Sequence, residues 1–174
     1  MIEIRGDLFN QTADAICITT NGYVKNNGRC VVGRGCAKAA DSKWSNFSLE
    51  LGKNIQTLGN VPSVVLDQNN ERPYSVLSFP VKPDYVTVEN NCKNIVGHTQ
   101  KHVRPGQRYY GWAAKADLKL IIRSAYALKE LADLLNYKKI VLPRPGCGAG
   151  ELHWDVVGPK LHRVLDNRFF SITF

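Results

Sequence analysis

The stretch VLPRPGCGAGELHW, residues 141 to 154, decides the fold of this chain. An apolar run ends at a proline, three glycines follow within five residues, and apolar residues then recur at helical spacing. Glycine costs conformational entropy when a chain folds, so Gly146, Gly148 and Gly150 indicate a turn that needs their small size or their backbone freedom. We interpret the stretch as a glycine-rich turn that joins a buried strand to a helix.

The rest of the chain alternates between strand and helix patterns. Apolar or alternating runs predict strands at residues 2–5, 15–20, 61–66, 74–79, 140–142 and 169–174. Apolar residues at helical spacing predict helices over residues 34–45, 45–55, 117–135 and 154–165. Ser45 is a candidate N-cap for the second helix. This order favours an α/β fold: a three-layer α/β/α sandwich with a mixed, largely parallel central sheet, in which residues 1–174 form a single domain.

Composition narrows the classes of protein and partner. The 174 residues carry a net charge of +8, which favours an anionic partner such as a nucleotide, a nucleic acid or a phosphorylated substrate. No apolar run approaches the roughly 18 residues of a membrane span, and the N-terminus has no basic-then-apolar leader. We therefore expect a cytoplasmic protein with no membrane partner.

Five cysteines at irregular spacing make a poor disulfide framework. Cys92, His98 and His102 resemble a metal-ligand set, but they lack a paired CxxC and a clear fourth ligand. We therefore expect neither a metal site nor a cofactor.

The segment from residue 83 to residue 115 shows little periodicity and predicts a long loop inserted in the domain. It interleaves basic and aromatic side chains: Lys93, His98, Lys101, His102, Arg104, Arg108, Lys115, Tyr85, Tyr109, Tyr110 and Trp112. This mixture suits a stacked, anionic ligand such as single-stranded nucleic acid. The alternative is a solvated surface insertion.

The glycine-rich turn has a natural guest. In an α/β sheet, ligands bind in the crevice at the carboxyl ends of the strands. Glycines let backbone N–H groups converge on an anion, and we expect the helix that follows to add its positive N-terminal end. A phosphate or pyrophosphate fits this description, whereas a tight structural turn is the alternative. The missing Gly-Lys-Ser/Thr argues against a P-loop, and GDLFNQ after the first strand argues against a dinucleotide-binding fold.

Four stretches, in order, resemble the macrodomain family. They are GDLF at 6–9, DAICITTNG at 14–22, NNGRCVVGRGCAKAA at 26–40 and LPRPGCGAGELHW at 142–154. The resemblance covers nearly the whole chain apart from residues 83–115. It is strongest to the branch that includes terminal ADP-ribose protein glycohydrolase and its phage and bacterial relatives, whose second ligand loop also reads GCG.

The resemblance implies that the ligand is ADP-ribose. Asp7 would accept a hydrogen bond from the adenine amino group, with Leu8 beside it, and Phe174 would lie near the adenine. Asn21 would hold the distal ribose, approached by the first loop at Gly33 and Gly35. The second loop would wrap the pyrophosphate with Gly146, Cys147, Gly148, Ala149, Gly150 and Glu151. Without the family, Asp7 and Asn21 are also common turn residues, and Phe174 could belong to the core.

Asn21 and Lys82 are the candidate catalytic residues. The resembled glycohydrolase uses a lysine at about the position of Lys82 and an aspartate in the second loop, where this chain has Gly150. The resemblance implies hydrolysis at the distal ribose, which would release ADP-ribose from protein or nucleic acid or dephosphorylate ADP-ribose 1″-phosphate. The missing aspartate leaves open a non-catalytic ADP-ribose reader, or a nucleic-acid-binding protein on the same fold. Lys82 could also be an exposed lysine at a strand end, and Cys147 a nucleophile without a partner base.

Overall fold

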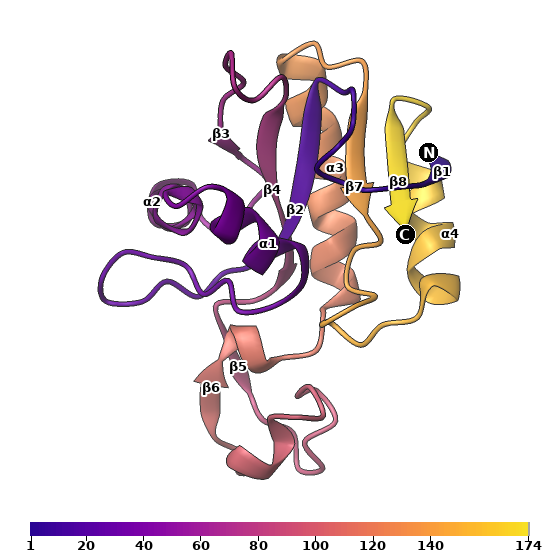
Figure 1. The fold of residues 1–174 in the computed structure, drawn as a ribbon. Coiled ribbons are helices and arrows are strands. Elements are labelled where there is room, and N and C mark those ends of the chain that lie inside the picture. The colour runs from indigo at the N-terminus through magenta and orange to yellow at the C-terminus, as the bar shows by residue number, and fades with distance from the viewer. Residues whose placement is uncertain (174) are drawn as a thin grey trace.

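The computed structural model describes residues 1–173 and has one central sheet of six strands (Figure 1). The strands lie in the order β1-β8-β7-β2-β4-β3, and all neighbours are parallel except the antiparallel pair β3 and β4. The sheet is therefore mixed and largely parallel, as the sequence predicts. The bounds are β1 Ile2–Arg5, β2 Ala15–Asn21, β3 Val64–Leu66, β4 Ser75–Lys82, β7 Ile140–Pro143 and β8 Phe169–Thr173.

Helices cover both faces of the sheet and complete the three layers (Figure 1). Along β2, Cys17 points to the face covered by α3 and α4, whereas Ile16 and Ile18 point to the face covered by α1 and α2. Because both faces are buried, β2 and β4 read as continuous apolar runs rather than as alternating ones. The helices are α1 Gly35–Lys43, α2 Phe47–Leu58, α3 Leu118–Leu134 and α4 Trp154–Val164.

The helix starts use different caps. Asp117 Oδ1 accepts hydrogen bonds from the N–H groups of Lys119 and Leu120, at 2.8 and 3.2 Å, and so caps α3. The prediction of Ser45 as the cap of α2 is wrong, because the N-cap residue of that helix is Asn46. The carboxylate of Asp41 takes over the capping role by accepting a hydrogen bond from Ser48 N at 3.0 Å. None of the helices in residues 1–173 is both long and apolar enough to cross a membrane.

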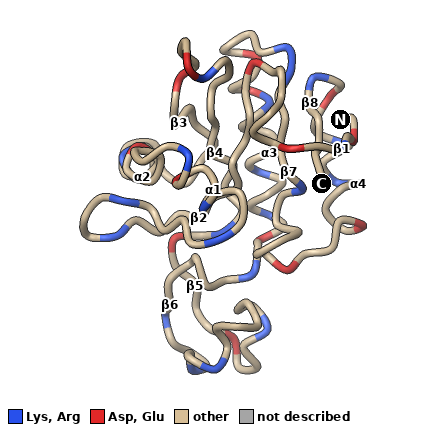
Figure 2. Tube along the Cα trace, in the orientation of Figure 1, with Lys and Arg blue, Asp and Glu red and all other residues tan. Residues whose placement is uncertain are grey.

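The segment 83–115 is a folded lobe, so the expectation of a long loop is wrong. It contains an antiparallel pair, β5 Tyr85–Thr87 and β6 Arg108–Tyr110, and two 3-10 helices at Gln100–His102 and Gly111–Ala113. Val88, Ile95 and Val103 form a small hydrophobic cluster of their own inside it. Its elements are three residues long, too short to leave a period in the sequence. Lys and Arg are spread over this lobe and over the loop between β2 and α1 (Figure 2).

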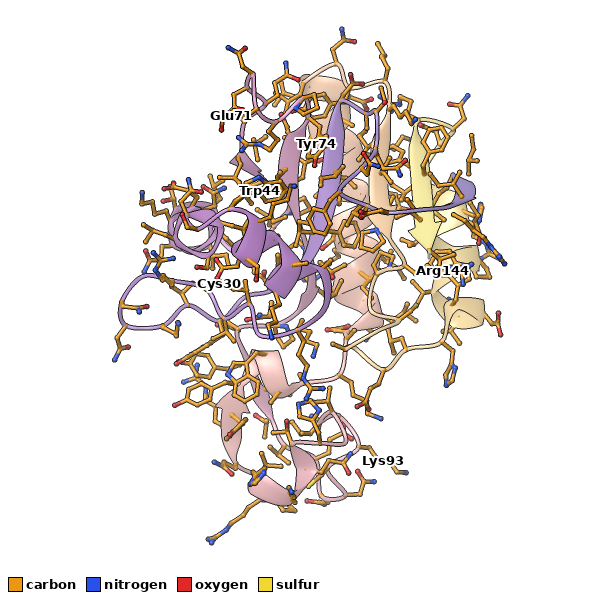
Figure 3. All side chains as sticks on the ribbon, viewed as in Figure 1. Cys30, Trp44, Glu71, Tyr74, Lys93 and Arg144 are labelled. Carbon is orange, nitrogen blue, oxygen red and sulfur yellow. The ribbon has the colours of Figure 1, made fainter. Side chains whose placement is uncertain are left out.

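The loop after β1 is held by aromatic residues. Trp44 lies next to Tyr74, with ring centroids 6.5 Å apart, and next to Phe9, at 5.7 Å (Figure 3). Tyr74 donates its hydroxyl hydrogen to the Phe9 carbonyl at 2.8 Å. Leu8 is 3 % exposed and belongs to the same core cluster. Packing therefore fixes this loop beside the ends of β1 and β8.

Candidate functional site

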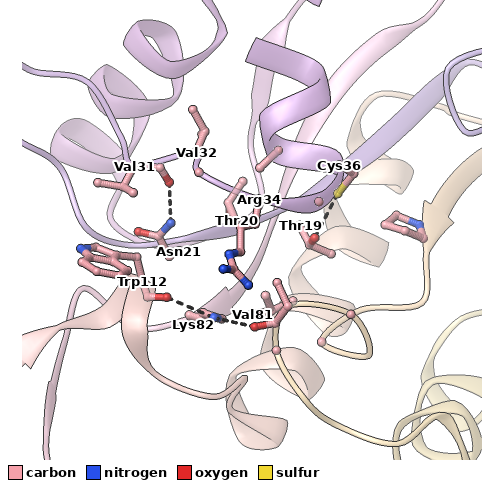
Figure 4. Close-up of a pocket in the computed structure, with 18 of the residues that line it drawn as sticks. Thr19, Thr20, Asn21, Val31, Val32, Arg34, Cys36, Val81, Lys82 and Trp112 are labelled. Atoms are coloured by element: carbon pink, nitrogen blue, oxygen red, sulfur yellow. Dashed lines mark hydrogen bonds between the residues drawn. The ribbon is translucent and has the colours of Figure 1, made fainter. Parts of the chain in front are cut away.

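A cavity of about 410 Å³ opens at the carboxyl edge of the sheet, where β2, β4 and β7 end (Figure 4). Four parts of the chain line it: the strand ends, the loop that leads into α1, the glycine-rich turn and the folded lobe. The lining residues are Thr19, Thr20, Asn21, Val31, Val32, Gly33, Arg34, Gly35, Cys36, Ala37, Val81, Lys82, His98, Trp112, Pro143, Arg144, Gly146, Gly148, Ala149 and Gly150.

The three glycines of the turn have two different roles. Gly146 has a φ of +77°, and a Cβ there would lie 2.8 Å from Ile121 Cδ1 and 2.9 Å from Ala116 Cβ. A Cβ at Gly150 would lie 2.5 Å from the Gly146 carbonyl oxygen. These two glycines therefore let the turn fold against α3. A Cβ at Gly148 would meet no atom within 4 Å, so this glycine leaves room in the cavity itself.

The turn uses its carbonyl groups inside the protein and keeps its N–H groups free. The carbonyls of Gly148, Ala149 and Gly150 accept hydrogen bonds from Glu151 N, Lys82 Nζ and Ala116 N at 2.9 to 3.0 Å. Within residues 1–173, the N–H groups of these three residues have no hydrogen-bond partner. Free N–H groups on a cavity wall are the feature that an anion requires.

The helix whose N-terminus lies at the cavity is α1. Gly35, Cys36 and Ala37 from its first turn line the cavity. The N-cap residue, Arg34, makes no side-chain cap, and the first turn contains no acidic residue. Its free N–H groups and positive dipole therefore face the cavity without a counter-charge from the helix itself. The expectation that the helix after the glycines plays this part is wrong, because α4 begins only at Trp154 and supplies no lining residue.

Lys82 is buried at the base of the cavity and is not the exposed strand-end lysine of the alternative interpretation. Its side chain is 8 % exposed, and Nζ donates hydrogen bonds to the carbonyl oxygens of Trp112 and Ala149 at 3.1 and 3.0 Å (Figure 4). Burial lowers the pKa of Lys82 to about 8, the carboxylate of Glu151 works in the opposite direction, and the charge of Arg34 adds to the lowering. A fraction of Lys82 is therefore neutral near pH 7.

Asn21 organises the loop between β2 and α1. Its Nδ2 donates to the Val31 carbonyl at 2.7 Å, and its Oδ1 accepts from Tyr23 N at 3.0 Å (Figure 4). The Cys30 thiol also lies 4.0 Å from Oδ1 as a second donor, so of the two N–H donors and two acceptor lone pairs of the carboxamide one N–H is left for a ligand. The turn interpretation and the ligand interpretation of Asn21 are therefore compatible.

Solved structures provide the comparison with known proteins. The macrodomain of Mycobacterium tuberculosis DarG superposes with a TM-score of 0.68 at 18 % identity, over 97 % of this chain and 94 % of that one. The macrodomain of Thermus aquaticus DarG gives 0.70 at 17 %, over 99 % and 97 %. Thermosipho africanus DarTG, solved in complex with ADP-ribose, gives 0.67 at 18 %, over 98 % of this chain and 41 % of that one. The chain has the macrodomain fold. The sequence matches no protein-family model and no curated protein.

The macrodomain cavity does not gather every residue that the sequence predicts for it. Asn21, Lys82, Gly33, Gly35, Gly146, Gly148, Ala149 and Gly150 line it. Asp7 and Leu8 do not: the Asp7 carboxylate accepts a hydrogen bond from Phe9 N at 2.9 Å, and Leu8 is in the core. Phe174 lies outside the described residues.

Cys147 and Glu151 belong to the macrodomain's second loop but also point away from the cavity. The Cys147 thiol packs against the core, and burial raises its pKa, which opposes a role as nucleophile. Glu151 is bound to the lobe, where Oε1 accepts from Gly97 N at 2.8 Å and Oε2 pairs with Lys115 Nζ at 3.3 Å. Neither side chain lines the cavity.

The sequence patterns did not predict that Arg34, His98 and Trp112 line the macrodomain cavity. Arg34 points into the cavity between Gly33 and Gly35, and its place between two predicted loop glycines was a usable signal (Figure 4). His98 and Trp112 reach the wall only because the lobe folds back on β4, which no local pattern announces. Within residues 1–173, no three His, Cys, Asp or Glu side chains lie close enough together to hold a metal ion, so Cys92, His98 and His102 form no cluster.

Substitutions at two glycines of this turn should separate binding from folding. Gly148→Val should change the thermal unfolding midpoint by no more than about 2 °C, since its side chain meets open space. It should abolish binding of an anion such as the pyrophosphate of ADP-ribose, because the added side chain would occupy the space in front of the free N–H groups. The matched control, Gly146→Ala, should lower the free energy of unfolding by about 2 to 4 kcal/mol, through a left-handed φ and contacts with α3. Thermal unfolding and calorimetric titration measure both effects. If Gly148→Val unfolds the protein as Gly146→Ala does, the whole turn is structural.

The lowered pKa of Lys82 should make stability depend on pH. The unfolded lysine keeps its proton up to about pH 10.5, whereas the folded one loses it near pH 8. The unfolded state therefore binds more protons between these values, and the contribution of Lys82 to stability rises with pH in this window. Between pH 7 and pH 9, the free energy of unfolding of the wild type minus that of Lys82→Met should rise by about 1 kcal/mol in urea titrations. A constant difference would mean that Lys82 titrates normally.

Proposed function

We propose that the protein binds ADP-ribose in this cavity and hydrolyses a bond at the distal ribose. One observation carries the proposal: the glycine-rich turn and the first turn of α1 present free N–H groups to a single cavity. Pyrophosphate is the group that such a pair of backbone walls accommodates. The volume of about 410 Å³ is within the range of small-molecule sites.

The charges around the cavity favour a pyrophosphate. Within residues 1–173, no Asp or Glu lines the wall, whereas Arg34, Lys82 and Arg144 do. Arg144 is already paired with Glu3 at 3.0 Å, so Arg34 and Lys82 are the main cations available to the ligand. Two like charges beside each other destabilise the apo protein, and a dianion between them would relieve that repulsion.

The strand order supports one orientation of the ligand. Because parallel strands end at one edge, a ligand lying along that edge passes the ends of β4, β2, β7, β8 and β1 in turn. The glycine-rich turn follows β7 and would bind the pyrophosphate in the middle. Asn21 and Lys82 at the ends of β2 and β4 would then meet the distal ribose. Asp7 follows β1, so it would lie on the side of the adenine.

The similarity to Thermosipho africanus DarTG, which was solved with ADP-ribose bound, supports the same ligand. At 18 % identity this similarity shows the fold alone. The assignment of the ligand therefore depends on the residues that line the cavity. The glycine turn, the end of α1 and Lys82 are those residues here.

Lys82 is the residue best suited to the chemistry. A neutral amine has two N–H groups and one lone pair. If the two N–H groups are donated to Trp112 O and Ala149 O, the lone pair is left for the ligand. In the simplest step, a water molecule attacks the anomeric carbon of the distal ribose while Lys82 takes a proton from this water. The bond from this carbon to the carried group breaks as the bond to the water oxygen forms, and the carried group leaves with the bonding electrons. The free N–H of Asn21 would donate to the ribose or to the oxygen of the water and so orient it.

The main alternative is a reader that binds ADP-ribose without cleaving it. Gly150 occupies the position expected for a loop aspartate, and the carboxylate of Glu151 next to it is bound to the lobe. Lys82 is then the candidate base that lies at the ends of the strands, next to Asn21. Catalysis therefore depends on the fraction of Lys82 that is neutral.

A nucleic-acid-linked substrate is favoured by the lobe. Trp112 lines the cavity and stacks on Tyr110, with ring centroids 6.4 Å apart and an angle of 15°. Tyr110 remains 40 % exposed, and the guanidinium of Arg108 lies 3.8 Å from the ring centre of Tyr85. These rings also pack on one another and on Tyr23, so part of the cluster is structural. Its exposed edge still offers a stacking surface with a positive charge beside the cavity.

ADP-ribose should bind with a Kd on the order of micromolar, which corresponds to a binding free energy of about −8 kcal/mol. AMP should bind more weakly, because it lacks the pyrophosphate that meets the two backbone walls and the distal ribose that meets Asn21 and Lys82. Isothermal titration calorimetry measures both. Equal affinity for AMP and ADP-ribose would contradict the assignment of the cavity.

Turnover assays should distinguish the hydrolase from the reader. The substrates are a peptide ADP-ribosylated on glutamate or serine, a single-stranded oligonucleotide ADP-ribosylated on thymidine or guanosine, and ADP-ribose 1″-phosphate. Lys82→Ala and Asn21→Ala should each lower turnover by about ten- to a thousandfold. The affinity of Asn21→Ala for ADP-ribose should change much less, because one hydrogen bond contributes about 0.5 to 1.5 kcal/mol. Lys82→Ala should weaken binding more than Asn21→Ala does, because it also removes a charge and two hydrogen bonds that join the cavity wall.

Lys93→Ala is the matched control for the loss of a lysine, because Lys93 is exposed on the lobe (Figure 3). It should leave turnover of the peptide substrate unchanged. Binding of ADP-ribose without cleavage of any substrate would establish the reader. Cleavage that neither Lys82→Ala nor Asn21→Ala slows would mean that other residues carry the chemistry.

A further inference from the structure

A tight turn in the lobe brings a histidine to the cavity. The Val96 carbonyl accepts a hydrogen bond from Thr99 N at 2.9 Å, which places Gly97 and His98 at the tip of a β-turn. Val96 and Thr99 are buried on either side, and Val96 N is bonded to the Ala113 carbonyl at 3.0 Å. The base of the turn is therefore anchored in the lobe, and its exposed tip reaches the cavity wall through His98.

The tip of this turn is held by the glycine-rich turn, through Glu151. Glu151 Oε1 accepts the N–H of Gly97 at 2.8 Å, directly before His98 in the chain. Glu151 belongs to the glycine-rich loop and has a φ of +59°, an unfavourable conformation for a residue with a side chain. Its second oxygen pairs with Lys115 at 3.3 Å. One carboxylate thus ties the phosphate-binding loop to the turn that carries His98.

The imidazole of His98 is free to meet a ligand. Among the described residues it has no hydrogen-bond or ion-pair partner, although its ring has a polar nitrogen on each side and lies close enough to the carboxylate of Glu151 to interact with its charge. The lobe's other contribution to the wall is Trp112, whose carbonyl is bonded to Lys82 Nζ. His98 therefore enters the cavity from the same lobe that contacts Lys82, at the end where the distal ribose is expected.

We propose that His98 contacts the distal ribose of the bound ligand and that Glu151 is the residue that positions it. This inference rests on the proposed function, and it adds a ligand contact and its support that the family resemblance does not supply. The imidazole hydrogen-bonds a hydroxyl of the distal ribose. Glu151 acts without touching the ligand, because it fixes Gly97 and hence the direction in which His98 leaves the turn.

A calorimetric comparison of ADP-ribose with ADP tests the proposal, since ADP lacks the distal ribose. His98→Ala should weaken ADP-ribose binding about three- to tenfold, the value of one hydrogen bond, and leave ADP binding unchanged. Glu151→Ala should cause the same selective loss. The double variant should lose no more than either single one, because both remove the same contact.

Two further variants separate positioning from a general effect on structure. Glu151→Gln keeps an oxygen that can accept the Gly97 N–H, so it should restore most of the ADP-ribose affinity. All titrations are made at pH 6.5, below the pKa of Lys82, so that the lost carboxylate charge does not discharge the lysine. His102→Ala, a matched control in the same lobe, should behave as the wild type because His102 lies outside the cavity wall.

Each other outcome overturns a specific statement. Equal losses for ADP and ADP-ribose in Glu151→Ala would show that Glu151 supports the whole cavity rather than His98. An additive double variant would contradict the positioning role. An unchanged ADP-ribose affinity in His98→Ala, with the wild type still preferring ADP-ribose to ADP, would overturn the contact alone. A wild type that binds neither nucleotide would overturn the proposed function together with this inference.

Discussion

The buried amine of Lys82, bonded to the carbonyl oxygens of Trp112 and Ala149, joins the parts of the molecule that form the cavity. The lysine ends β4, Trp112 belongs to the lobe, and Ala149 belongs to the glycine-rich turn. A lysine removed from water is costly, which lowers its pKa to about 8. Buried ionisable groups with a shifted pKa are typical of functional sites. Here two hydrogen bonds and the charge of Glu151 offset part of the cost of burying the lysine.

The glycine-rich turn divides its work among residues that look alike in the sequence. Gly146 and Gly150 are required because α3 and the turn's own backbone occupy the space of a side chain. Gly148 is required only if something else must occupy the space next to it. The carbonyl groups of the turn are satisfied inside the protein, so its free N–H groups are available to an anion without any rearrangement.

The lobe also contributes to the cavity wall, through His98 and Trp112. Glu151 and Lys82 each connect it to the rest of the site, the first through Gly97 and Lys115 and the second through Trp112. Removing the lobe would therefore expose Lys82 and free the glycine-rich turn as well as removing aromatic and basic surface. For this reason the lobe is part of the cavity and cannot be treated as an independent attachment.

The sequence by itself determined the layers, the sheet type and the glycine-rich turn. Continuous apolar runs such as residues 15–20 are buried on both faces, and glycines mark backbone that must bend or leave room, so these features depend on local chemistry. Gly148 could be predicted to line the cavity for the same reason, whereas Asn21 and Lys82 were predicted to line it from the resemblance to the macrodomain family. Only the tertiary structure decided that α1 rather than α4 points at the cavity, that Glu151 turns away from it, and that His98 and Trp112 enter it. These outcomes depend on hydrogen bonds between residues far apart in the chain, such as Gly97 with Glu151, and no local pattern records such a pairing.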